Sequence, residues 1–178
     1  ACLTKRLQPF ASRLTARPGN FADLAEFAAD AGIISAHGIL FDLGFSSDQV
    51  DAPERGFSFQ SDGPLDMRYD RSGGPTAADI IARTPQTDLA DILFEFGGER
   101  RSRRIAREIA DRRRHQAFAT TADLAGFVAG ILGHRGRIHP ATRTFQALRI
   151  YVNQELENLS AGLNGALHLL APGGRLVV

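Results

Sequence analysis

Apolar residues follow two patterns along the chain, short continuous runs and helical spacing, which predict different elements. Residues 39–41 form a continuous apolar run that ends in Asp42, as is typical of a buried parallel strand. Residues 175–178 predict a second strand, after a sharp turn at residues 171–174. Helical spacing predicts helices over residues 1–14, 21–30, 76–83, 87–96, 99–115 and 121–132. A longer helix, broken near residues 162–165, is predicted from about residue 142 to residue 170.

The order of these elements predicts an α/β fold with an inserted helical domain. Strands towards both ends of the chain alternate with helices, which indicates an α/β layer. The helical block between them is much longer than the dozen or so residues that a parallel crossover needs. We therefore expect residues 1–49 and 141–178 to form one domain and residues 50–140 a second, helical one. Residues 51–75 are rich in turn formers but also carry Leu65 and Met67, which predicts an ordered loop.

The composition excludes several classes of protein. No apolar run in the 178 residues is long enough to span a bilayer, and the first residues lack the apolar run of a signal peptide. Cys2 is the only cysteine, which excludes an internal disulfide and a cysteine metal cluster. The five histidines show no metal-ligand spacing, so no metal site is expected. These features favour a cytoplasmic protein.

Asp42 is the first candidate for a functional residue. Ligands of open α/β sheets bind at the carboxyl ends of the strands, and Asp42 directly follows the first apolar run. The alternative is that Asp42 caps a turn while Ser46 and Ser47 only satisfy backbone groups. The segment by itself does not decide between the two interpretations.

A strongly basic segment stands out in a chain whose net charge is only +1. Residues 99–115 hold eight arginines and three acidic residues, and this basic excess suits the phosphates of a nucleic acid. We take Arg103, Arg104 and Arg107 as candidates for phosphate contacts. The alternative is a solvated helix face with internal ion pairs.

Residues 139–147 are a second candidate for anion binding. A helix is predicted to begin here, and its first N–H groups together with Arg143 could hold a phosphate. The alternative is that Thr142 or Thr144 only caps the helix, while Phe145 and Leu148 pack in the core.

Several segments together resemble a known family. Residues 170–178 (LAPGGRLVV) resemble the turn into the fifth strand of S-adenosylmethionine-dependent class I methyltransferases. Sharper matches, to the bacterial MraW/RsmH family, are DLGFSSDQ (42–49), ERGFSF (54–59), DGPLDMR (62–68) and HPATRTFQ (139–146). The resemblance implies methyl transfer from S-adenosylmethionine to the N4 of a cytosine in the decoding centre of 16S rRNA. It also implies a Rossmann-like methyltransferase domain with an inserted all-helical domain.

The resemblance also assigns roles to individual residues. Three of them match positions that contact the cofactor: Phe21, Asp42 and Gln49. Others lie in segments that would flank the substrate pocket: Asp66, Met67, Arg68, His139, Thr142 and Arg143. Asp42 is in addition the candidate catalytic residue, because its carboxylate, like the hydroxyls of Ser46 and Ser47, could accept a hydrogen bond from the reacting amine. Within the first motif, Phe45 and Asp48 stand where the family usually has valine and proline.

Two points about the whole protein follow from the resemblance. The family's glycine-rich cofactor loop and a C-terminal segment are not among the 178 residues, so we expect this chain to be part of a longer protein. The implied partner is 16S rRNA or the small ribosomal subunit, and the oligomeric state stays open, with a homodimer as one option. A different function class is a non-catalytic rRNA-binding protein that retains the methyltransferase scaffold; binding of S-adenosylmethionine distinguishes the two.

Overall fold

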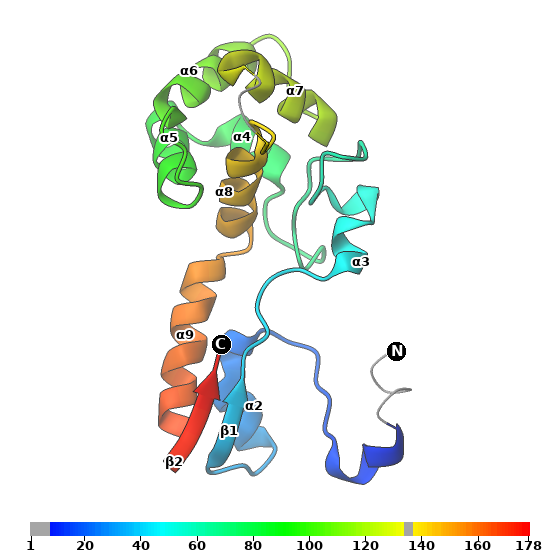
Figure 1. Cartoon of the computed structure of the whole chain (residues 1–178), viewed down its shortest axis with the longest axis vertical. Helices are drawn as coiled ribbons and strands as arrows, with labels where there is room; N and C mark the ends of the chain where they lie inside the picture. The colour runs from blue at the N-terminus through cyan, green and yellow to red at the C-terminus, as the bar shows by residue number, and fades with distance from the viewer. Residues whose placement is uncertain (1–7, 134–136) are drawn as a thin grey trace. The chain divides into compact units, whose positions relative to one another are not determined.

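A computed structural model describes residues 8–133 and 137–178, apart from the side chains of residues 47 and 48. The chain separates into two compact units (Figure 1). Unit 1 consists of the described residues up to Leu43 and of Leu156–Val178, and unit 2 of Gly44–Glu155. These limits differ from the predicted boundaries at residues 50 and 140, mainly because helix α8 (Thr142–Val152) packs on two helices of unit 2, α4 (Ala77–Arg83) and α5 (Gln86–Glu95).

Unit 1 contains the two predicted strands, and they pair in parallel. Strand β1 (Ala36–Leu40) lies beside β2 (Leu170–Val177), with Leu40 opposite Val177. The sharp turn predicted at residues 171–174 falls inside β2, where the register pairs none of these residues with β1 and Gly173 takes a positive φ of 80°. The register of the pair is irregular between Ala36 and Gly38, which is where the extra residues of β2 are accommodated. Mixed helices and parallel strands are consistent with a Rossmann-like methyltransferase fold.

Helices α2 (Leu24–Asp30) and α9 (Glu155–Leu169) lie beside this strand pair (Figure 1). The prediction at residues 21–30 is confirmed as η2 (Phe21–Asp23) followed by α2 (Leu24–Asp30). Asn20 caps this segment, because its side chain accepts the N–H of Ala22 at 3.0 Å. Of the helix predicted at residues 1–14, residues 1–7 lie outside the described part of the chain, and η1 (Gln8–Arg13) is a 3-10 helix.

The predicted break at residues 162–165 is wrong, because helix α9 (Glu155–Leu169) runs through both glycines. The break lies earlier, between α8 and α9, where Gln154 takes a positive φ of 50°. Gly162 instead allows α9 to approach η2. A Cβ at this position would lie 2.7 Å from Cδ2 of Phe21, which is too close for an ordinary contact. The need for glycine at position 162 follows only from its contact with Phe21, which the sequence does not indicate.

Unit 2 contains the four helices predicted between residues 76 and 132. Besides α8, it consists of α3 (Ser47–Val50), η3 (Pro53–Arg55), α4 (Ala77–Arg83), α5 (Gln86–Glu95), α6 (Ser102–Arg112) and α7 (Thr121–Leu132). Local capping explains why the bounds of α4 could be predicted. The Thr76 side chain accepts the N–H of Asp79, and the Asp79 carboxylate accepts the N–H of Thr76. The short α3 and η3 were not predicted.

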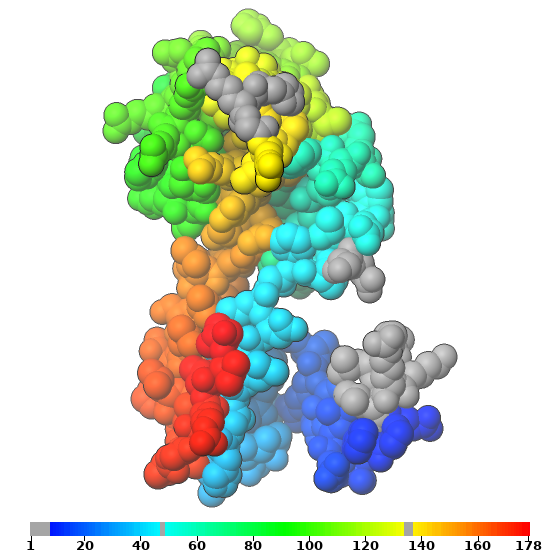
Figure 2. All heavy atoms as spheres, viewed as in Figure 1, coloured from blue at the N-terminus to red at the C-terminus, as the bar shows by residue number. Residues whose placement is uncertain are grey.

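The core of unit 2 forms where α5 packs on α6 and α8. The buried stripe predicted for residues 99–115 is confirmed, since these residues are all buried: Ile105, Ala106, Ile109 and Ala110. The prediction that residues 51–75 form an ordered loop is also confirmed, because Leu65 and Met67 enter the same core. Residues of α5 and α6, green in Figure 2, cover one side of unit 2.

Candidate functional site

Asp42 lies at the carboxyl edge of the parallel strand pair in unit 1. The pairing of β1 with β2 extends to Phe41, whose N–H donates to Val177 O at 2.9 Å, and Asp42 is the next residue. Its side chain is exposed and makes no hydrogen bond or ion pair with any residue that the structure describes. It therefore does not cap a turn among these residues. A carboxylate without a partner at this edge is available to accept hydrogen bonds from a ligand.

Phe21 is held in unit 1 by aromatic packing. It is half-buried, and its ring centroid lies 5.4 Å from that of Phe41, the residue before Asp42. On its other side it is in close contact with α9 at Gly162. Part of the Phe21 side chain thus serves the core, and its position depends on how closely α9 packs.

Gln49 belongs to unit 2 and stabilises the turn before α3. Its Oε1 accepts the N–H of Ser46 at 2.9 Å, so the side-chain oxygen of Gln49 is already engaged. Ser46 is exposed. The Ser47 side chain, the other hydroxyl predicted as an acceptor, lies outside the described side chains.

Asp66 and Arg68 are engaged with each other rather than open to solvent. Asp66 is 6% exposed, and its two oxygens accept from Nε and Nη2 of Arg68 at 2.7 and 2.9 Å. These hydrogen bonds from Arg68 hold the pKa of the Asp66 carboxyl below its usual value. The remaining Nη1 of Arg68 donates to the carbonyls of Gly73 and Gly74 at 3.2 Å. The pair thus fixes the loop, and Met67 between them is fully buried with a φ of 64°.

Asn153 ties this loop to the end of α8. Its Nδ2 donates to Met67 O at 2.7 Å, and its Oδ1 accepts the N–H of Tyr69 at 2.7 Å. The same Nδ2 also donates to Arg149 O at 2.9 Å. Arg55 supports the loop from another direction through hydrogen bonds to the carbonyls of residues 68 and 69. Sequence reasoning missed Asn153, although an asparagine at a helix break is a signal that could have drawn attention to it.

Tyr69 and Arg149 meet at the carboxylate of Glu155. The Tyr69 hydroxyl donates to Glu155 Oε1 at 2.9 Å, and Arg149 forms two bonds to the same carboxylate at 2.8 and 3.0 Å. Burial, followed by the nearby Glu155 charge, raises the pKa of Tyr69. The Arg149 guanidinium also lies 4.6 Å from the ring centroid of Phe45. Phe45 therefore has a cationic partner in this chain, which fits a phenylalanine at this position.

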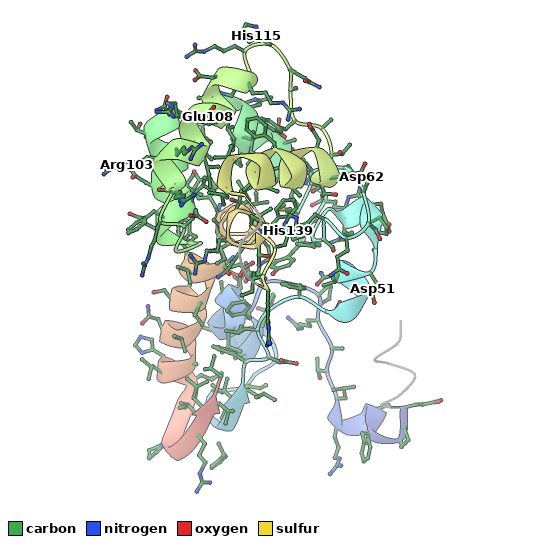
Figure 3. All side chains as sticks on the ribbon, turned by 45° about the horizontal axis from the view of Figure 1, so that its top comes forward. Asp51, Asp62, Arg103, Glu108, His115 and His139 are labelled. Carbon is green, nitrogen blue, oxygen red and sulfur yellow. The ribbon has the colours of Figure 1, made fainter. Side chains whose placement is uncertain are left out.

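His139 packs against the core at the start of α8 (Figure 3). Its ring centroid lies 4.6 Å from that of Phe59, and its Nδ1 accepts the N–H of Ala141 at 3.2 Å. The N-cap of α8 is Ala141, with no side-chain cap, so the alternative that Thr142 or Thr144 caps the helix is wrong.

The rest of this segment divides between the core and the surface. Phe145 and Leu148 are buried, as that alternative proposed. Arg143 is exposed, with one long hydrogen bond of 3.4 Å to Gly98 O.

Two of the eight arginines at residues 99–115 are structural. Arg112 donates to both oxygens of Asp123 at 2.6 and 2.8 Å, and its guanidinium lies 4.2 Å from the ring centroid of Phe118. Arg113 donates to the carbonyls of Ile81 and Thr84 at 2.6 and 2.7 Å. These two cannot contact RNA without breaking contacts inside unit 2.

The three arginines predicted to contact phosphates lie on the exposed side of α6. Arg103 and Arg104 make no ion pair or side-chain hydrogen bond with any residue of the described ranges. Arg107 pairs with Glu108 at 3.0 Å, an exposed contact of small value. Internal ion pairing thus accounts for only part of the basic segment.

Within residues 8–133 and 137–178, no three histidine, cysteine, aspartate or glutamate residues gather as a metal site would require. No helix in the same ranges has the length and apolar character needed to cross a membrane.

Comparison with known proteins gives consistent matches along the chain. Residues 1–178 match the MraW methylase family. A protein of Thermomicrobium roseum named ribosomal RNA small subunit methyltransferase H is 53% identical over 170 residues, which are 95% of this chain and 52% of that protein. Proteins of the same name from Acidiphilium cryptum and Syntrophotalea carbinolica are 53% and 51% identical, over 94% and 98% of this chain and 54% and 56% of their own lengths. The chain thus spans about half the length of these relatives.

Proposed function

Since the chain belongs to the MraW methylase family, we propose that its protein methylates the exocyclic N4 of a cytosine in the decoding centre of 16S rRNA. The observation that carries this proposal beyond family membership is the carboxylate of Asp42, which has no partner among the described residues and lies at the carboxyl edge of a parallel strand pair. Relatives at 51–53% identity are named rRNA small subunit methyltransferases, which supports an rRNA substrate. The methyl donor in this proposal is S-adenosylmethionine.

The residues of unit 1 fit such a donor. The exposed Asp42 carboxylate can accept hydrogen bonds from hydroxyl or amino groups, and the Phe21 ring can pack against a flat apolar group. We assign both to cofactor binding, together with Gln49 of unit 2. S-adenosylmethionine, when bound, supplies an electrophilic methyl group on a sulfonium. The family's glycine-rich loop would complete the cofactor site in the longer protein.

The chain's own contribution to chemistry is to orient and deprotonate the amine. The exocyclic amine of cytosine is a weak nucleophile, because its lone pair is conjugated with the ring. An acceptor beside it orients the base and takes up charge as the nitrogen becomes cationic. We assign Asp42 as the catalytic candidate, and the hydroxyls of Ser46 and Ser47 are the alternatives if Asp42 is engaged by the cofactor.

Unit 2 is proposed to bind the RNA, as an all-helical domain inserted into a Rossmann-like methyltransferase domain. The target cytosine must leave its stack to reach the reacting group, so the flanking backbone has to be held while it does. Exposed arginines of α6 are proposed to hold phosphates: Arg103, Arg104 and Arg107. Residues in the loop before α4 and around the start of α8 are proposed to flank the substrate pocket: Asp66, Met67, Arg68, His139, Thr142 and Arg143. Since Asp66 and Met67 are buried, their part is to shape the loop.

The proposed partner is 16S rRNA or the small ribosomal subunit, in the cytoplasm. The competing function is a non-catalytic rRNA-binding protein, which the exposed arginines would serve equally well. Calorimetric titration of the full-length protein with S-adenosylmethionine separates the two. The absence of heat at high micromolar cofactor, with RNA binding intact, would support the non-catalytic protein.

Replacement of Asp42 tests the site itself. We expect Asp42→Asn to abolish methyl transfer to small ribosomal subunits, measured as incorporation of labelled methyl groups, because the amide loses the charge that favours the cationic nitrogen. Asp111→Asn, which removes an exposed carboxylate from α6, is the control and should keep its activity. Near-normal turnover by Asp42→Asn would show that Asp42 is not a catalytic residue.

A further inference from the structure

An open hollow lies between α5 and the start of α6 in unit 2. Its volume is about 270 Å³, and its lining residues are Gln86, Thr87, Ala90, Asp91 and Arg103. Ala90 is buried, whereas the four polar lining residues are exposed. The hollow is smaller than the roughly 300–1,000 Å³ of pockets that bind drug-sized ligands, so it suits a group no larger than a single base.

Four arginines at residues 100–104 carry positive charge that is unpaired among the described residues, and one of them, Arg103, lines the hollow. They are all exposed, and their guanidinium groups form no ion pair or hydrogen bond within the part of the chain that the structure describes: Arg100, Arg101, Arg103 and Arg104. The later arginines of the segment differ, because each has a partner in the fold: Arg107, Arg112, Arg113 and Arg114. The only nearby acidic side chain in residues 99–104 is the buried Glu99, which accepts the N–H of Arg101 at 2.8 Å.

The uncompensated positive charge of these arginines is unfavourable in the free protein, and an anionic ligand would neutralise it. Positive charge near the N-terminus of a helix is unfavourable, and α6 has no acidic residue in its first turn to offset it. A phosphate backbone would neutralise several of these charges at once. Arginine suits this ligand because its planar guanidinium can bind a phosphate with two bonds or stack on a base.

The lining of the hollow carries one negative charge, on Asp91, beside the positive charge of Arg103. The carboxylate of Asp91 would repel an anion, but it accepts hydrogen bonds from amino groups such as those on base edges. The amide of Gln86 can both donate and accept, as base edges require. The surroundings therefore favour a phosphate at the arginines and a base in the hollow.

We propose that the hollow and the four arginines that have no partner among the described residues, together the α5–α6 subsite, bind one unpaired nucleotide of single-stranded RNA. The proposal rests on the proposed function only in taking RNA as the ligand. The bound nucleotide is one that flanks the target and not the methylated cytosine itself. Arg103 lines the hollow and projects from the outer side of the helices (Figure 3), so it can stack on the base or bind its phosphate.

The test compares two oligonucleotides that differ only in their bases. Fluorescence anisotropy of the full-length protein is measured with a labelled decamer of cytidine nucleotides and with an abasic decamer of the same ribose-phosphate backbone. We expect the cytidine decamer to bind about two- to tenfold more tightly, the value of one or two net hydrogen bonds. In a Gln86→Ala, Asp91→Ala double variant this preference should vanish, while affinity for the abasic decamer is kept or increased.

The arginines are tested by the salt dependence of binding. Each contact with a single-strand phosphate contributes about 0.7 to the slope of log K against log salt concentration. An Arg103→Gln, Arg104→Gln double variant should therefore bind both decamers more weakly and lose about 1.4 from the slope. Arg83→Gln is the matched control: it removes an exposed arginine of α4 that pairs with Asp79, and should leave the slope unchanged. Unchanged thermal unfolding of each variant verifies that the fold is intact.

Two results would overturn the proposal. Equal affinity of the wild type for both decamers would show that the hollow does not bind a base. An unchanged salt slope in the arginine double variant would show that Arg103 and Arg104 do not contact RNA phosphates and would point to another partner, such as an acidic protein. Neither result affects the proposed methyl transfer, which is measured separately by methyl incorporation and by Asp42→Asn.

Discussion

The close contact between α9 and Phe21 leads to a prediction about one glycine. A Cβ added at Gly162 would lie 2.7 and 3.0 Å from ring atoms of Phe21 and 3.2 Å from its carbonyl oxygen. Three residues further along the same helix, a Cβ added at Gly165 would meet only ordinary contacts, the nearest at 3.6 Å from Ala25 N. Gly165→Ala is therefore a matched control for Gly162→Ala.

The magnitude follows from two opposing contributions. Alanine is favoured over glycine inside a helix by about 0.8–1.0 kcal/mol, and this gain applies to both variants. Overpacking costs about 1–3 kcal/mol, and this cost applies only to Gly162→Ala. The difference between the variants cancels the helix propensity and leaves the packing cost of about 1–3 kcal/mol. We expect Gly165→Ala to stabilise unit 1 and Gly162→Ala to be less stable than Gly165→Ala by that amount.

Differential scanning calorimetry and cofactor binding together test this reasoning. At about 2–4 °C per kcal/mol for a chain of this size, the two unfolding midpoints should differ by about 2–12 °C. Since Phe21 must move to admit the new methyl group, Gly162→Ala should also weaken S-adenosylmethionine binding in a calorimetric titration, and Gly165→Ala should not. Equal midpoints would show that Phe21 is not fixed by α9. A lower midpoint with unchanged cofactor affinity would remove Phe21 from the cofactor site.

Three further predictions concern unit 2. Asn153→Ala should lower the free energy of unfolding, measured in urea, by about 2–4 kcal/mol, because it leaves partly buried backbone groups of the loop without hydrogen bonds. A loss below about 1 kcal/mol would contradict this prediction. The lowered pKa of Asp66 means that its contribution to stability is present above its ordinary pKa of 3.8 and is lost as the pH falls through the lowered value. Asp66→Asn should therefore flatten the acid part of the stability profile, and an unchanged profile would exclude this carboxylate. Arg112→Gln should lower the free energy of unfolding by about 2–4 kcal/mol, since it breaks the ion pair with Asp123 and the cation–π contact with Phe118. The control is Arg114→Gln, which replaces an exposed arginine and should change the free energy of unfolding by less than about 0.5 kcal/mol.

The parts of the fold that could be predicted depend on signals within a few residues. Helix α7 begins and ends at the predicted residues, and Thr120 accepts the N–H of Asp123 at its start. The apolar run before Asp42 correctly predicted a parallel strand that ends at this carboxylate, but the predicted burial is wrong for most of it, since Leu40 is 70% exposed and only Phe41 is buried. Both are encoded by neighbours in sequence, through a capping hydrogen bond in α7 and through a short apolar run in β1.

Features that depend on distant residues could not be predicted. The break between α8 and α9 falls at Asn153, whose side chain binds the backbone of residues 67 and 69, more than 80 positions earlier. Gly162 seemed to interrupt a helix, but it accommodates a ring from the other end of the chain. Neither partner has a sequence pattern that would point to it.

The sequence by itself determined the types of most elements, the buried stripe of α6 and the motifs of the family, because these follow from periodicity and from residues that are adjacent in the chain. Only the tertiary structure decided which arginines of the basic segment remain available. Eight similar side chains divide into those that bind Asp123 or the carbonyls of α4 and its end, and those that stay in solvent. Side-chain type is the same in both groups, and the difference arises because folding brings partners to one side of the helix and leaves the other side without them.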